Sequence, residues 1–405
     1  RWRTRALPIT SDPALRGSAG GSSARRQVTW TLRCMQHHRV VVGAAAWRGD
    51  LCADVLGTAV PDSSGPPSQR EPGDVGAMIA AMDTASWYRS FAQVEASGSS
   101  PIYEALAGAV ADSSEVVTCL EELPVAKRQP NLLLASARLV GAPLDDPADF
   151  VDVVTARWSD VAGVMAERST QTNEPARTAA FLPLLAAIDG PVALIEVGCS
   201  AGLCLFPDRY SISYNGAASL VPQSPVRVDV EASGPVPLPT RLPEVVARIG
   251  VDLNPLDVTN AEDLAWLEAL IWPEHVTRLA RLRAAAQVVA DDPPTLLRGD
   301  LVDTIDDAIA MAPPESTKVV FHSAVLNYLA PTARAEFAER VRRHPRTVWF
   351  ANEAPGVLDG VTTELLPPPS ASAPAFFVLS EGTHRTIGIS DPHGTWLRWA
   401  GSDPA

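Results

Sequence analysis

A turn with two glycines, EVGCSAG at residues 196–202, follows an apolar segment and contains groups suited to binding a nucleotide-like cofactor. A strand that leads into such a turn exposes backbone N–H groups to a ligand, because glycine has no side chain to block the approach. The dinucleotide pattern G-x-G-x-x-G is not met, since Ser200 stands at its second glycine and Cys204 lies two residues past Gly202. A pyrophosphate needs that close approach, whereas S-adenosylmethionine has no phosphate. We therefore expect Glu196, Gly198, Ser200 and Gly202 to bind S-adenosylmethionine; alternatively, the glycines only shape a tight corner.

A carboxylate that binds ribose hydroxyls is expected roughly 20 residues after the glycines, at the end of the second strand. We expect this strand at SISYNG, residues 211–216, where Asn215 is a polar candidate and no carboxylate is present. Asp252 and Asp257 are alternatives, either as ligands or as turn residues. Asp300 ranks above both, because it ends a later strand where a carboxylate can accept from an adenine amino group. The sequence thus adds Asn215 and Asp300 to the predicted cofactor site.

The segment RSTQTNEPAR, residues 168–177, concentrates charged and amide side chains before the glycine turn. Residues three or four apart fall on one side of a helix, so several can point toward the strand ends. An arginine there binds a carboxylate through two N–H groups. Such a cluster would give catalytic roles to Arg168 and Glu174 and substrate-binding roles to Gln171, Asn173 and Arg177. The alternative is a solvent-exposed helix start capped by Thr172 or Asn173.

His322 ends the apolar strand KVVFHS, at the carboxyl edge where open α/β sheets bind ligands. We predict that it is a general base that removes a proton from an acceptor oxygen or nitrogen during methyl transfer. The alternative is a hydrogen-bonded structural histidine. Tyr328 and Glu353, after this strand and the next, are expected to line the same pocket, with Tyr328 binding substrate. Ser323 lacks the G-x-S-x-G elbow of a hydrolase, which leaves that activity weakly supported.

The elements that must position these residues alternate between strand and helix from residue 189 to 400. Strands are expected at 192–198, 294–300, 317–325 and 346–353. Helices are expected at 200–206, 260–292, 301–313 and 332–344, and the second of them is interrupted at Pro273. Two strands in succession at 375–382 and 384–394 predict a closing antiparallel hairpin. The pattern predicts an α/β fold with a doubly wound, mostly parallel sheet, preceded by a helical cap at residues 78–188.

The amino-acid composition of the chain limits the classes of partner that it is expected to bind. The net charge of -14 argues against extended contact with nucleic acid, and no apolar run reaches the roughly 20 residues of a membrane span. The five cysteines have no metal-ligand spacing, and neither do His384 and His393, so we predict free thiols, no metal site and a cytoplasmic protein. Residues 1–77 are poor in periodic apolar residues and are expected to be a disordered extension or spurious upstream sequence. The oligomeric state cannot be predicted.

Several segments resemble, in order along the chain, the domain-of-unknown-function family numbered 2332. They include SWYRSFAQVEASGSSPIYEAL, KRQPNLLLASARL, RSTQTNEPAR, LIEVGCSAGL with DRY, GVDLNPLDV, IWPEHVTRLARL and VVFHSAVLNYL. The resemblance implies a divergent class I S-adenosylmethionine-dependent methyltransferase with a helical N-terminal region. It also favours a functional site over a capped helix start at residues 168–177, and we predict the roles given above on this ground. Cys204 stands where the family pattern has asparagine. The predicted function is methyl transfer to a small molecule, and the alternative is a non-catalytic ligand-binding or regulatory module on the same scaffold.

Overall fold

The computed structural model describes residues 83–362, Leu366 and residues 375–400, all of which fall in one compact unit. The predictions for residues 1–77 lie outside the described residues. Within this part of the chain, eleven α-helices accompany ten strands, which confirms a mixed α/β fold. None of the described helices combines the length and the apolar character that crossing a bilayer requires.

All regular elements of the described chain before the first strand are helices. Polar caps set their boundaries: Ser100 accepts the N–H of Tyr103, and Asp146 accepts the N–H groups of Ala148 and Asp149. The helices are α3 (Thr84–Ser90), which continues as the π-helix η1 (Phe91–Ala96), α4 (Pro101–Asp112), α5 (Ser114–Glu121), α6 (Pro130–Leu139), α7 (Pro147–Ala156), α8 (Trp158–Glu167) and α9 (Thr178–Ala186), with 3₁₀ turns η2 (Val125–Lys127) and η3 (Pro175–Arg177).

One sheet contains all the described strands, in the order β2-β3-β10-β9-β8-β7-β6-β1-β4-β5. The strands are β1 (Pro191–Val197), β2 (Ser211–Tyr214), β3 (Arg227–Ser233), β4 (Glu244–Asp252), β5 (Thr295–Arg298), β6 (Thr317–Ser323), β7 (Thr347–Glu353), β8 (Phe377–Glu381), β9 (Arg385–Ser390) and β10 (Trp396–Trp399). The block from β5 to β7 is parallel, whereas β8 and β9 add to it in antiparallel fashion, as the predicted hairpin requires.

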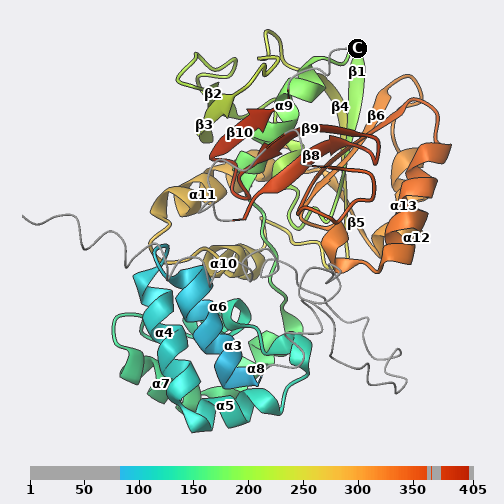
Figure 1. The fold of residues 1–405 in the computed structure, drawn as a ribbon. Coiled ribbons are helices and arrows are strands. Elements are labelled where there is room, and N and C mark those ends of the chain that lie inside the picture. Colours follow the sequence, from blue (N-terminus) through green and yellow to red (C-terminus); the bar gives the residue numbers. More distant parts are fainter. Residues whose placement is uncertain (1–82, 363–365, 367–374, 401–405) are drawn as a thin grey trace, which may run out of the picture. The chain divides into compact units, whose positions relative to one another are not determined.

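Helices cover both faces of the parallel block. Helices α12 (Leu301–Ala310) and α13 (Pro331–Arg343) pack on one face through Ile305 and Phe337, and α9 packs on the other face through Phe181. Figure 1 shows α12 and α13 together on one side of the parallel strands. Burial on both faces explains why β1 is almost entirely apolar.

Three features differ from the sequence prediction. Residues 168–174, which were expected on a helix, have no regular secondary structure and lie between α8 and η3. The chain after the glycine turn forms only the 3₁₀ turn η4 (Leu203–Leu205), where a helix was expected. Strand β4, which was not predicted, lies beside β1, while the expected second strand SISY is β2 at the outer edge of the sheet. Helices α10 (Ala261–Ala269) and α11 (Val276–Asp291) confirm the predicted interruption near Pro273.

Candidate functional site

The glycine turn leaves β1 at the point where the sheet order reverses, with β4 on one side and β6 on the other. Open α/β sheets bind ligands at this place, outside the carboxyl ends of the strands. Gly198 and Gly202 have φ values of 67° and 72°, and Ser200 adopts a left-handed φ of 52°. A Cβ at Gly198 would lie 2.4 Å from Cγ2 of Val325, so the turn also needs glycine for packing. The backbone therefore has the shape that the glycine pattern predicts.

Asp252 ends β4, directly beside the turn. Its carboxylate accepts the Ser200 N–H at 2.8 Å, the Asn254 N–H at 2.8 Å and an amide N–H of Gln171 at 3.2 Å. Burial raises the pKa of Asp252, while these hydrogen bonds oppose the shift. Asp252 is thus a carboxylate at the end of the strand adjacent to the glycine strand, the position that the sequence analysis assigned to SISYNG.

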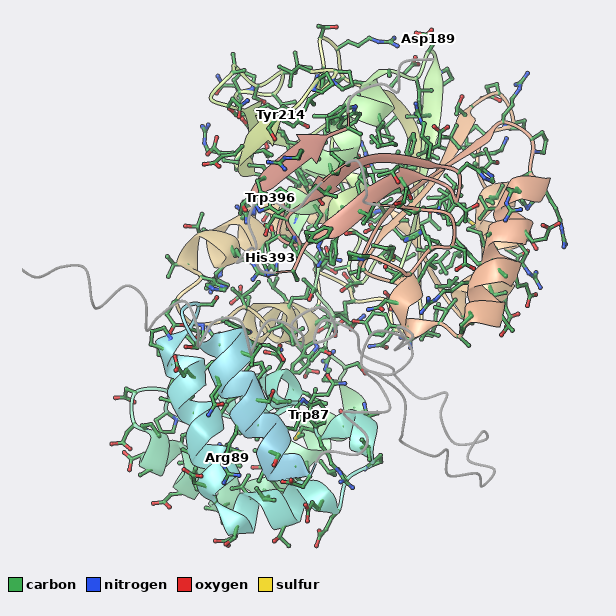
Figure 2. All side chains as sticks on the ribbon, in the orientation of Figure 1. Trp87, Arg89, Asp189, Tyr214, His393 and Trp396 are labelled. Carbon is green, nitrogen blue, oxygen red and sulfur yellow. The ribbon has the colours of Figure 1, made fainter. Side chains whose placement is uncertain are left out.

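Asn215 lies elsewhere, because β2 pairs with β3 at the far edge of the sheet. Its side-chain amide bonds both the N–H and the carbonyl of Ala232, at 2.7 Å each, which closes the β2–β3 pair. Tyr214, seen on β2 in Figure 2, donates its hydroxyl to the Ala179 carbonyl. The geometry gives both side chains a structural role and leaves the turn free of them.

Asp300 follows β5, the strand next to β4, and its side chain accepts the Val302 N–H at 2.8 Å as the N-cap of α12. The order of the strands thus places Asp252 and Asp300 at the carboxyl ends of neighbouring strands. Asp257, in contrast, accepts the N–H and hydroxyl of Thr259 in an exposed turn.

Gln171 and Asn173 hold the turn from the helical side. Asn173 donates to the carbonyl of Cys199 and accepts the Leu203 N–H at 3.1 Å, so it bonds the turn on both sides of Ser200. Gln171 donates to Asp252, and its Oε1 is buried without a partner among the described residues. Both residues therefore lie at the site, where they position the turn.

Arg168 and Glu174 form ion pairs away from the turn. Arg168 pairs with Asp263 of α10. Glu174 is 2% exposed and receives the Nε–H groups of Arg278 and Arg281, each at 2.8 Å. Burial alone would raise the pKa of Glu174, but the two guanidinium groups lower it below its usual value. The predicted catalytic roles of both residues stay predictions, and the contacts favour structural ones.

His322 points to the face of the sheet that α13 covers. It is fully buried, its Nδ1 lies 2.6 Å from Oε1 of Glu353, and its Nε2 accepts the indole N–H of Trp349 at 2.9 Å. Because an indole N–H is only a donor, Nδ1 must carry the proton of the neutral ring. Glu353 also accepts the N–H groups of Val325 and Leu326. The geometry favours the structural alternative for His322, which supports the loop over Gly198.

A small pocket of about 10 Å³, room for about one water molecule, lies beside the turn. Its lining comes from the 168–177 segment, α9, the turn and the end of β6: Thr172, Asn173, Arg177, Phe181, Glu196, Gly198, Cys204, Phe321 and Ser323. Arg177 donates to the carbonyls of Ser323 and Pro392, and Tyr328 is close enough to affect its pKa, which burial lowers. Burial raises the pKa of Glu196, and its Oε2 has no partner among the described residues. The pocket is therefore lined by a guanidinium and by a carboxyl group whose pKa burial raises.

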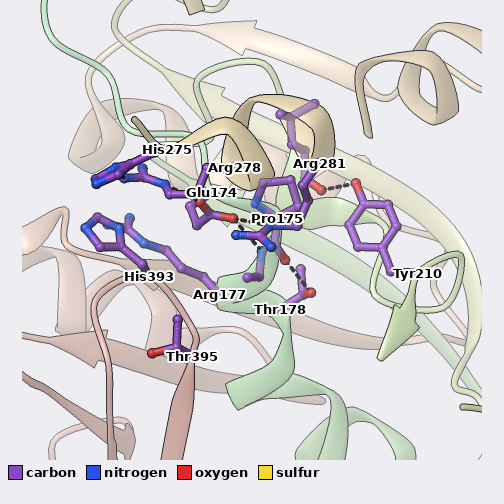
Figure 3. A network of polar contacts seen from close by, with 12 residues as sticks. Glu174, Pro175, Arg177, Thr178, Tyr210, His275, Arg278, Arg281, His393 and Thr395 are labelled. Carbon is purple, nitrogen blue, oxygen red and sulfur yellow. Dashed lines mark hydrogen bonds and ion pairs between the residues drawn. The ribbon is translucent and has the colours of Figure 1, made fainter. Parts of the chain in front are cut away.

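A cluster next to this pocket contains residues that the sequence analysis missed (Figure 3). Arg278 and Arg281 come from α11, His275 precedes this helix, and His393 lies in the turn between β9 and β10. The spacing of Arg278 and Arg281 is that of an ordinary amphipathic helix, so only their shared contact with Glu174 identifies them.

A family model described as an uncharacterized protein conserved in bacteria (DUF2332) matches residues 85–399, and the chain therefore belongs to this family. The matched range includes the helices before β1, the glycine turn and the sheet as far as β10. A comparison with curated proteins gives no match.

Proposed function

We propose that this member of the DUF2332 family is an S-adenosylmethionine-dependent methyltransferase that acts on a small molecule. Its finer fold would then be of the class I methyltransferase type, with residues 78–188 as a helical cap and residues 189–400 as the Rossmann-like domain. The order β5-β4-β1-β6-β7 supports this proposal, because it corresponds to the first five strands of the doubly wound order 3-2-1-4-5-6.

The observation that carries the proposal is the placement of Asp252. A carboxylate at the end of the strand beside the glycine strand is where a ribose diol binds in such sheets. The Ser200 N–H holds Asp252 at 2.8 Å, so the acidic group and the turn form one unit. Asp300 at the end of the next strand extends the acidic edge toward the place expected for an adenine amino group.

The pocket residues suit the rest of the cofactor. The N–H groups of Gly198 and Gly202 are bonded within the protein, to the carbonyls of Val251 and Cys199. The unpartnered Oε2 of Glu196 offers a hydrogen-bond donor when protonated. Arg177 supplies a buried positive charge at the same pocket. S-adenosylmethionine, when bound, supplies an already activated methyl group, so the protein contributes mainly orientation and exclusion of water.

Isothermal titration of the full-length chain with S-adenosylmethionine and S-adenosylhomocysteine tests the proposal. We expect both to bind, and we expect Asp252→Asn to weaken binding about tenfold or more, because a hydrogen bond to a charged acceptor contributes about 1.5–3 kcal/mol. Asp257→Asn is the matched control, since Asp257 is in an exposed turn. A folded protein that binds neither compound would refute the proposal.

A second candidate is a non-catalytic module that uses the same pocket. The specific observation in its favour is that Arg168, Glu174 and His322 are absent from the pocket lining among the described residues. Incubation with methyl-labelled S-adenosylmethionine and a small-molecule cell extract separates the two. Binding without transfer of label to any extract component would favour the module, and transfer would favour the enzyme.

A further inference from the structure

The cluster around Glu174 has more positive than negative charge. Arg177, Arg278 and Arg281 each bring a guanidinium, and Glu174 is the carboxylate that contacts two of them. Arg177 is 7% exposed and its donors meet the neutral carbonyls of Pro392 and Ser323. Buried charges are normally paired, because the loss of hydration is otherwise uncompensated. Three guanidinium groups share this one contacting carboxylate, and burial raises the pKa of the other nearby carboxyl group, that of Glu196, so positive charge is in excess and favours a further anion.

The hydrogen-bond donors of the cluster are also incompletely used. Arg278 and Arg281 give only their Nε–H groups to Glu174, and Nη1 of Arg278 lies 3.2 Å from Nδ1 of His275. A guanidinium has five N–H groups in a fork that matches a carboxylate or phosphate. Within the described residues, the terminal nitrogens of Arg281 and Nη2 of Arg278 meet no protein acceptor, so both forks keep donors for a ligand.

His393 adds a buried ring nitrogen without a partner. Its Nδ1 is shielded from solvent, and no described residue bonds to it. Burial, followed by the charges of Arg278 and Arg177, lowers the pKa of His393 far below its usual value. Figure 3 shows the rings of His393 and His275 on the same side of the Glu174 ion pairs. An orphan nitrogen among guanidinium groups is the arrangement expected where an acceptor-rich ligand completes the hydrogen bonds.

The backbone holds His393 in place. Asp391 accepts the N–H groups of His393 and Thr395, at 2.9 Å and 3.0 Å, and Arg177 donates to the carbonyl of Pro392 at 2.8 Å. Gly394 lies so close to η3 that a Cβ there would be 2.3 Å from the Ala176 carbonyl oxygen. The turn is thus fixed against the segment that carries Arg177, and the cluster is organised before any ligand arrives.

We propose that Arg177, Arg278 and His393 form a subsite for the anionic group, a carboxylate or a phosphate, of a small-molecule ligand. Two sources share this chemistry: the methionyl carboxylate of the cofactor and an anionic group of the methyl acceptor. The subsite goes beyond the proposed function, because it binds anions whether or not the protein binds S-adenosylmethionine.

Titration of the full-length chain with inorganic phosphate, followed by calorimetry at constant ionic strength, tests the subsite. We expect a dissociation constant on the order of 1 mM. His393→Phe and Arg278→Gln should each weaken binding about tenfold, the loss expected for one charge-assisted contact. Glu174→Gln, which removes the competing carboxylate, should bind phosphate more tightly. Arg283→Gln is the control, because Arg283 lies on the same helix but pairs with Glu268 in a more exposed position.

His393→Phe and Glu174→Gln keep the test decisive if Arg278→Gln does not fold. Absence of phosphate binding, or the same affinity in all variants and the control, would overturn the inference. Competition then identifies the source of the anion. Displacement of phosphate by S-adenosylhomocysteine but not by methylthioadenosine, which lacks the carboxylate, assigns the subsite to the cofactor. Displacement by neither assigns it to the acceptor. Phosphate binding without any binding of S-adenosylhomocysteine would refute the proposed function alone.

Discussion

Replacing His322 with phenylalanine tests whether this residue supports the loop over the glycine turn or transfers a proton. The new ring would still face Phe337 and Trp349, which contact the imidazole edge-on or tilted. The indole N–H of Trp349 would lose its acceptor, and Oε1 of Glu353 would lose one of its donors. A buried unpaired donor costs about 1–3 kcal/mol, and a hydrogen bond to a carboxylate contributes about 1.5–3 kcal/mol. We therefore expect the free energy of unfolding to fall by about 3–6 kcal/mol.

Urea denaturation followed by circular dichroism measures this loss, and titration with S-adenosylhomocysteine shows whether the pocket changes. The double variant with Trp349→Phe removes the orphaned N–H, so it should be more stable than the sum of the two single losses predicts. Unchanged stability of His322→Phe together with loss of methyl transfer would refute the structural interpretation and restore the role of a base.

Three further predictions concern the turn and its surroundings. Burial raises the pKa of Glu196, so as the pH rises above about 4.5 this carboxyl group ionises in the unfolded chain before it ionises in the folded protein. The free energy of unfolding should therefore fall with rising pH above about 4.5. Glu196→Gln should make this fall smaller, as measured by urea denaturation at a series of pH values. Gly198→Ala should destabilise the protein through its positive φ and its contact with Val325, and Val325→Ala should restore part of the loss in melting temperature. Arg248→Lys keeps the charge but loses the bidentate pair with Asp208, at 2.8 Å and 2.7 Å, and should lower the unfolding free energy by about 1–3 kcal/mol in urea.

Local patterns were sufficient to predict most elements but not their order in the sheet. The strand before the glycine turn and the closing hairpin both follow from residues close in sequence. Strand β4 was not predicted because its residues, EVVARIGVD, run into a turn rich in Asp, Asn and Pro. Its run of buried residues is also short. Its pairing with β1 joins segments about 50 residues apart, which periodicity cannot detect.

Local sequence also indicates only some of the side chains that meet at the candidate site. Gln171, Asn173 and Arg177 occur in one short polar segment, so the sequence could single them out, and they lie at the turn or its pocket; their substrate-binding roles stay predictions. It could not indicate that His393 reaches the same cluster, since the contact of its turn with Arg177 spans 215 positions along the chain. Nor could it show that His322 faces α13, because the two faces of a strand buried on both sides look alike in sequence.

Ser200 illustrates how a departure from a motif can preserve its backbone. A serine in the left-handed region is strained by about 1–2 kcal/mol relative to glycine, yet Ser200 adopts a φ of 52° and gives its N–H to Asp252. The bond to Asp252 compensates part of this strain and uses the N–H group that a pyrophosphate would otherwise need. Ser200 therefore keeps the turn and its acidic neighbour together, while its Cβ occupies the space that the second glycine of the dinucleotide pattern leaves for a pyrophosphate.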